Sequence, residues 1–223
     1  MWDLHGEPAP IVEDRRLEQP ENKTSPNAQQ PKQRTQTNEA IRIMTVRTGA
    51  MLPTIPAGST VFINTRFSTN QLKIGDIVTF YRPKNPQDNS EIHLDRIVGM
   101  GGDKIQMWDG VLRINGQAVK RERVDDYVPV ENGVPGKPIK RWRETLPNVV
   151  SHMTLDLIDN GFYDKTPVYP VPANHYFMMG DNRDNSTDSR MLIQMGYIPV
   201  ENIVGKVLSW SSSTSPGEGQ AVR

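Results

Sequence analysis

The chain contains no cysteine among its 223 residues. This absence excludes disulfides, thiolate metal sites and cysteine nucleophiles. Net charge is also absent, because 26 lysines and arginines balance 26 aspartates and glutamates, so nucleic acid is not an expected partner. Long apolar runs are missing, and the N-terminus lacks a basic patch followed by an apolar stretch. We therefore expect this chain to be soluble, while the compartment in which it works stays open.

The first 40 residues offer little that a folded core could bury. Proline, glutamine, asparagine, glutamate and lysine dominate there, and aromatic and β-branched residues are scarce. We interpret residues 1–40 as a disordered polar tail. Order is expected to begin at Ile41, where apolar and polar residues alternate as on a half-buried strand. Residues 211–223 are expected to form a frayed C-terminus.

Short β-type runs recur after this tail, and turn residues separate them. The runs cover residues 41–46, 60–63, 76–81, 92–98, 104–108, 111–114, 176–179 and 203–208. Asp109-Gly110 and Asn115-Gly116 are typical of two-residue type I′ hairpins, whose central residues both need positive φ. No long stretch shows a 3.6-residue apolar period, so we expect only a helical turn or two, near residues 51–53 or 190–193. The fold class predicted is mainly β, with antiparallel strands.

Residues 122–166 do not fit this pattern. They are polar and interrupted by proline and glycine, and they show neither the two-residue period of a strand nor the 3.6-residue period of a helix clearly. We interpret them as an insertion or long connection within a domain of residues 41–210.

Three segments carry the strongest functional signal, and they follow one another in order. The first is Thr48-Gly49-Ala50-Met51-Leu52-Pro53-Thr54. The second runs from Gly75-Asp76-Ile77-Val78 to His93-Leu94-Asp95-Arg96-Ile97-Val98-Gly99-Met100-Gly101-Gly102-Asp103, and the third is Gly180-Asp181-Asn182-Arg183-Asp184-Asn185-Ser186-Thr187-Asp188-Ser189-Arg190. Together they resemble the sequence boxes of bacterial type I signal peptidases, the Ser/Lys-dyad endopeptidases that cut signal peptides from exported proteins.

The resemblance implies a mixed antiparallel β-barrel-like fold with a β-rich insertion, and a serine protease site with no cofactor and no metal. It places the family's nucleophilic serine at Ala50 and its general-base lysine at Asp95. A methyl group has no lone pair with which to attack a carbonyl, and Asp95 is acidic, so we predict an inactive protein. Thr48 matches an oxyanion-hole serine, and Ser186 matches a serine that accepts a hydrogen bond from the lysine.

Other groups could replace the dyad only in part. Thr48 could act as a nucleophile, or Asp95 as a general base on water, but both alternatives are weaker than loss of activity. A solvated strand carboxylate is the plain interpretation of Asp95. Because a hydroxyl can also donate, we hypothesise that Ser186 donates a hydrogen bond to Asp95.

The resemblance also implies a peptide cleft and a loop that supports it. Met51, Ile92, His93 and Leu94 match cleft-lining positions, where an extended peptide would add as a strand, although Met51 and Leu94 could be core residues only. The charged residues of the third box, Asp181, Arg183, Asp188 and Arg190, are expected to hold a loop through Arg–carboxylate pairs rather than to react. His93 and His175 lack metal-ligand spacing.

Three functions therefore compete. The first is a non-catalytic relative of signal peptidase I that binds extended peptide. The second is an altered or truncated form of an active signal peptidase, a family that sits at the outer face of the bacterial inner membrane. The third is a cytoplasmic regulator of the related self-cleaving repressor fold, and nothing upstream resembles its DNA-binding helix-turn-helix.

Overall fold

Two groups of β-strands account for most of the chain that the structure describes. The structure is a computed structural model, and it describes residues 40–83, 91–212 and 215–221. The predicted disordered tail lies outside the described residues apart from Ala40. Residues 38–223 belong to one compact unit, and this unit includes the predicted domain.

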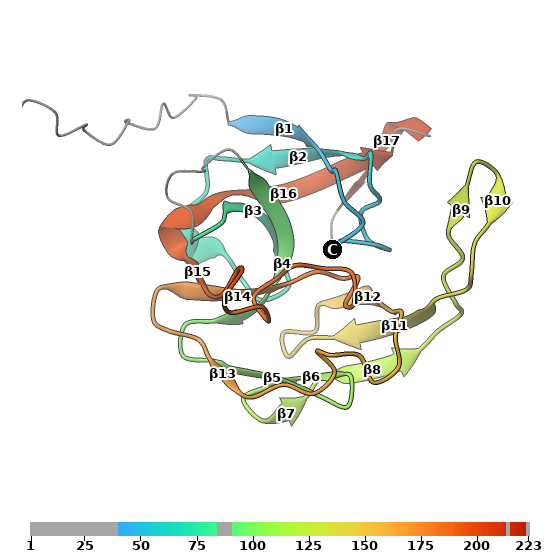
Figure 1. The fold of residues 1–223 in the computed structure, drawn as a ribbon. Helices are drawn as coiled ribbons and strands as arrows, with labels where there is room; N and C mark the ends of the chain where they lie inside the picture. The colour runs from blue at the N-terminus through green and yellow to red at the C-terminus, as the bar shows by residue number, and fades with distance from the viewer. Residues whose placement is uncertain (1–39, 84–90, 213–214, 222–223) are drawn as a thin grey trace, which may run out of the picture. The chain divides into compact units, whose positions relative to one another are not determined.

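An eight-stranded antiparallel sheet forms the first group (Figure 1). Its strands are β1 (Ile41–Thr45), β2 (Thr60–Asn64), β3 (Ile77–Tyr81), β4 (Ile92–Met100), β14 (His175–Met179), β15 (Ile198–Pro199), β16 (Ile203–Ser212) and β17 (Ser215–Ala221). They lie in the order β1-β2-β16-β3-β4-β14-β15, and β17 pairs with β16. In β2, Val61 and Ile63 are buried and alternate with half-buried residues, as the two-residue period of a strand requires.

The second group contains the predicted insertion. One sheet has the order β13-β5-β6-β7, built from β5 (Lys104–Trp108), β6 (Val111–Ile114), β7 (Gln117–Ala118) and β13 (Tyr169–Pro170). Another has the order β12-β11-β8, built from β8 (Lys120–Arg123), β11 (Lys140–Thr145) and β12 (Ser151–Asp156). The strands β9 (Val130–Glu131) and β10 (Val134–Pro135) form a short hairpin, which extends away from β8 and β11 (Figure 1).

The two predicted hairpin turns are confirmed. Asp109 and Gly110 have φ values of 50° and 71°, and they join β5 to β6. Asn115 and Gly116 have φ values of 55° and 82°, and they join β6 to β7. The mainly β, antiparallel fold class is confirmed with them.

A single helical turn is present at each predicted position, and two 3₁₀ turns that were not predicted lie elsewhere. In the part of the chain described, the helical elements are two 3₁₀ turns, η1 (Thr69–Gln71) and η2 (Val200–Asn202). Each predicted position instead holds one isolated i→i+4 hydrogen bond, from Ile55 N to Met51 O and from Met195 N to Met191 O, both at 2.8 Å. Neither turn continues, because proline follows directly after Ile55 and Gly196, at φ 67°, leaves the helical region.

The C-terminus also differs from the prediction of a frayed end. β16 continues to Ser212, and Ser215–Ala221 forms β17 alongside it. Polar sequence gave no strand signal here, but backbone pairing with an open strand edge needs no apolar side chain.

Three hydrophobic clusters form the core. The first lies around Phe177 and Ile105, the second around Phe80 and Ile97, and the third around Met51. Since β4 and β14 supply residues to both of the first two clusters, these strands are the centre of the packing.

Truncating Phe177 tests this assignment. Phe177 is fully buried, so Phe177→Ala removes its packing and leaves a cavity, and we expect the unfolding free energy to fall by about 3–5 kcal/mol. Urea unfolding followed by tryptophan fluorescence measures the change. Phe162→Ala is the matched control, because Phe162 is 87% exposed, and it should change stability by less than about 0.5 kcal/mol. Equal losses in both variants would contradict this core.

Candidate functional site

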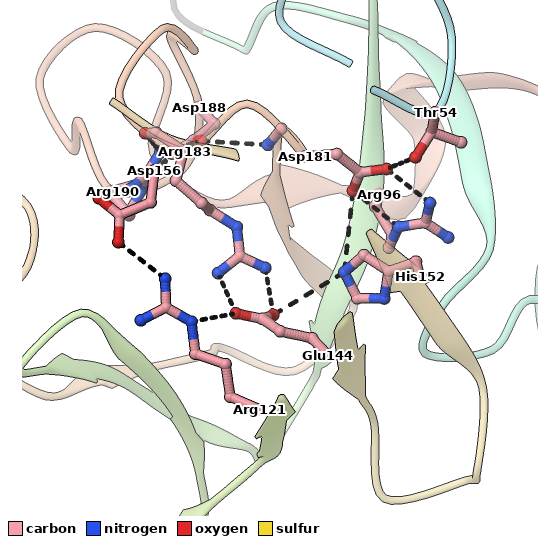
Figure 2. Close-up of polar contacts among 11 residues, drawn as sticks. Thr54, Arg96, Arg121, Glu144, His152, Asp156, Asp181, Arg183, Asp188 and Arg190 are labelled. Carbon is pink, nitrogen blue, oxygen red and sulfur yellow. Dashed lines mark hydrogen bonds and ion pairs between the residues drawn. The ribbon is translucent and has the colours of Figure 1, made fainter. Parts of the chain in front are cut away.

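One buried carboxylate joins the three sequence boxes (Figure 2). Asp181, from the third box, accepts two hydrogen bonds from Arg96 of the second box, at 2.9 Å from Nε and 2.7 Å from Nη2. Thr54, the last residue of the first box, donates its hydroxyl to Asp181 Oδ2 at 2.5 Å. Burial alone would raise the pKa of Asp181, but the Arg96 charge and its hydrogen bonds outweigh burial and lower that pKa.

Two further bidentate pairs hold the rest of the third box. Arg183 donates to Glu144 at 3.0 and 2.5 Å, and Arg190 donates to Asp188 at 2.8 and 2.7 Å. Asp188 Oδ2 also accepts the backbone N–H of Gly180 at 3.1 Å. Two parallel hydrogen bonds fix the guanidinium and the carboxylate in one geometry. These pairs can therefore hold the loop in a single conformation.

His152 lies between the Arg183–Glu144 pair and the Arg96–Asp181 pair (Figure 2). Its Nε2 is 3.8 Å from an oxygen of Glu144 and 3.8 Å from an oxygen of Asp181. Burial, followed by the charge of Arg96, lowers the pKa of His152 from 6.5 to about 4. The imidazole is therefore neutral at neutral pH.

The backbone at Ala50 is fixed to the third box. Asn182 donates its N–H to Ala50 O at 2.9 Å and its side-chain amide to Gly49 O at 3.0 Å. Gly180 permits this approach, because a Cβ there would lie 2.3 Å from Ser186 Oγ and 2.7 Å from Ala50 O. The structure therefore brings Ala50, Gly180 and Ser186 together.

Asp95 is only 3% exposed, so its interpretation as a solvated carboxylate is wrong. Burial is the largest effect on its pKa, and the charges of Asp188 and Asp181 add to it, so the pKa lies well above 3.8 although Arg190 opposes the shift. Asp95 lies on β4 opposite Val78 of β3. Asp95 is thus a buried carboxyl group that favours its neutral form.

The hydrogen bond predicted between Ser186 and Asp95 is not formed. Ser186 Oγ is buried and has no hydrogen-bond partner among the described residues. Continuing the β4–β14 register one residue beyond its last pair, Met179 with Arg96, places Gly180, on which Ser186 packs, opposite Asp95. The prediction rested on the ability of the Ser186 hydroxyl to donate a hydrogen bond. Whether the two groups come within hydrogen-bonding distance depends on how the loop that carries Ser186 packs.

The predicted cleft residues differ in exposure. Met51 is 1% exposed and lies in the third core cluster, against which Leu94 packs. Ile92 and His93 are half-buried, and Thr48 is exposed. Burial lowers the pKa of His93, which stacks on Phe80 of the neighbouring strand at a centroid distance of 5.8 Å. A role in binding peptide stays a prediction for Met51, Ile92, His93 and Leu94, as does the oxyanion-hole role of Thr48.

Sequence reasoning missed part of the buried network. Glu144, on β11, and His152, on β12, come from the segment that showed no clear pattern. Arg121 on β8 joins them, with Nε 4.0 Å from Glu144 and Nη2 3.0 Å from Asp156 (Figure 2). Strand alternation was the only available signal, and it indicates which face a residue occupies but not which charge it meets.

A family described as signal peptidase, peptidase S26 matches residues 35–211, which include most of the chain and the whole of the site. The chain belongs to this family. A signal peptidase I of Rickettsia typhi is 41% identical over 138 residues, which are 59% of this chain and 49% of that protein. The corresponding enzyme of Rickettsia conorii is 40% identical over 138 residues, 59% of this chain and 48% of its own length.

The match to signal peptidase I covers only part of those proteins, since the chain spans about half the length of the curated relatives it matches. A solved signal peptidase I from Enterococcus faecalis is 19% identical, with a TM-score of 0.34, and covers 61% of this chain and 96% of that one. So low a score supports no structural inference. Within the described residues, we find no helix with the length and apolarity needed to span a bilayer.

Removing the acidity of Asp95 should stabilise this signal peptidase relative. A carboxyl group whose pKa is raised on folding destabilises the native state as pH rises from about 4 through the folded pKa, because the unfolded chain releases its proton first. Asp95→Asn abolishes that cost, so its urea midpoint at pH 7 should exceed that of the unaltered protein. Near pH 3 the urea midpoints of Asp95→Asn and the unaltered protein should be equal, because Asp95 is then protonated in both the folded and the unfolded chain. An Asn variant that is less stable at pH 7 would contradict a neutral Asp95.

His152 should make the protein sensitive to acid. Its pKa falls from 6.5 when unfolded to about 4 when folded, so the unfolded chain binds the extra proton between these values and stability declines as pH drops from 6.5 to 4. The full loss from this group is about 3 kcal/mol. His152→Gln should reduce the decline measured by urea unfolding across that range, whereas His175→Gln, outside the network, should leave it unchanged.

Proposed function

We propose that this member of the signal peptidase family binds an extended peptide without cutting it. The observation that carries the proposal is the combination of an open strand edge at β4 with a methyl group and a buried carboxyl at the two dyad positions, Ala50 and Asp95. Its relatives bear the name signal peptidase I, and the peptide class is inferred from that name.

The open edge supports peptide binding. β3 pairs with β4 from Ile92 to Arg96, but β14 pairs with β4 only from Arg96 to Met100. On its second side, the segment from Ile92 to Leu94 therefore has no strand partner within the described residues. An extended peptide could add there as a strand, with its backbone hydrogen-bonded to β4 and alternate side chains directed into the site.

The chemistry at positions 50 and 95 supports loss of cleavage. Acyl transfer needs a nucleophile and a base that accepts its proton. Ala50 cannot attack, and Asp95 in its neutral form cannot accept a proton. Losing a serine nucleophile typically lowers the rate by about 10⁶-fold, which leaves about 10³- to 10⁴-fold over water from binding alone.

An altered form of an active signal peptidase is the second candidate. It is favoured by the intact frame around the site, in which the three boxes still meet at Asp181 and Asn182 still anchors Ala50. Two separate changes argue against it, because the loss of the serine alone would have removed activity.

A paired binding and cleavage assay with a signal-peptide cleavage segment tests the proposal. We expect the unaltered protein to bind the segment in the micromolar range and to leave it uncut. No binding at high micromolar concentration, or cleavage at enzymatic rates by pure protein, would contradict the proposal.

The double variant Ala50→Ser, Asp95→Lys shows whether the dyad alone is missing. We expect it to recover cleavage, since the surrounding contacts are in place, and each single variant to stay at background because nucleophile and base act as a unit. If the double variant binds the segment but does not cleave it, the cleft has changed beyond these two positions.

A further inference from the structure

Asp95 lacks a cation of its own. Arg190, whose charge acts on Asp95, is already engaged with Asp188 through two hydrogen bonds, and Arg96, the next residue along the chain, is engaged with Asp181 in the same way. No described residue forms an ion pair with Asp95. If Asp95 were ionised, the carboxylates of Asp95, Asp181 and Asp188 would share two guanidinium groups, one positive charge fewer than would balance them.

A hydrogen-bonding group beside Asp95 is also without a partner. Ser186 is 7% exposed, and its Oγ has no hydrogen-bond partner among the described residues. It packs on Gly180, next to Ala50 O and beside Asp95 across the β4–β14 pairing. Ala50 is half-buried, so the loop that carries it lies near the surface. An uncompensated carboxyl and an unpartnered hydroxyl therefore face the same position.

We propose that this position binds a primary ammonium group, supplied by a lysine side chain of the peptide held on β4. The peptide as its source rests on the function proposed above. The ammonium would donate hydrogen bonds to the Asp95 carboxylate and to Ser186 Oγ. An ammonium is a compact charge with three donors, which suits an acceptor set of one carboxylate and one hydroxyl.

Binding would release a proton. The neutral Asp95 carboxyl loses its proton to solvent, and its carboxylate then pairs with the incoming ammonium. Asp188, Asp181 and Arg190 are the charged groups that act on the pKa of Asp95, and all three are already paired, Asp181 with Arg96 and Asp188 with Arg190.

A free amine tests the site without a peptide. We expect n-butylammonium to raise the melting temperature and to bind with release of about one proton, measured by calorimetry in buffers of different ionisation enthalpy. n-Butanol should do neither. In Asp95→Asn both effects should disappear, and in Asp125→Asn, an exposed carboxylate, both should persist. No amine effect, or the same effect in Asp95→Asn, overturns the ammonium site.

Peptides then identify the source of the amine. Acetylated cleavage segments carrying lysine at successive positions are compared with norleucine at the same positions and with a free N-terminus. We expect one lysine position to lower Kd at least tenfold, with the preference lost in Asp95→Asn. Equal Kd values for lysine and norleucine at every position overturn the lysine assignment, and a preference for the free N-terminus alone names that amine instead. If no peptide binds but butylammonium does, the proposed function fails and the ammonium site stands.

Discussion

The paired hydrogen bonds between Arg96 and Asp181 are the constraint on which the site depends. They join β4 to the loop that follows β14, and Thr54 attaches the loop carrying Ala50 to the same carboxylate. Three segments far apart in the chain thus meet at one group that is 1% exposed. A buried charge is tolerated only when it is paired and hydrogen-bonded, so this contact permits a single arrangement of the three boxes.

The charges around this contact are balanced with one exception. Arg183 pairs with Glu144 and Arg190 with Asp188, and the neutral ring of His152 fills the space between two of the pairs without adding charge. Asp95 is the group that the network does not compensate. Its burial beside other carboxyl groups costs free energy in any ionised state, which is why it remains neutral until a cation reaches it. The buried carboxyl that we propose to prevent cleavage is therefore also the group that we propose to select a ligand.

The sequence predicted local features well and distances poorly. The turns at Asp109-Gly110 and Asn115-Gly116 follow from positive φ, a property of the residues themselves. Burial of Asp95 was not foreseen, because a strand carboxylate is normally solvated and the charged residues that act on this one, Asp181, Asp188 and Arg190, are far from it in the sequence. The roles of Glu144 and His152 were missed, since their partners come from other strands and no spacing along the chain marks them.

The sequence by itself determined the family and the mainly β class, because these depend on residue identity and order. Tertiary structure alone decided the environment of Ala50 and Asp95. It placed Asp95 beside Gly180 and Ser186, left Ser186 Oγ without a partner, and closed the ion pairs around Asp181. Desolvation and electrostatic pairing act through space, so protonation state and ligand preference follow from which strands pack together rather than from the order of residues.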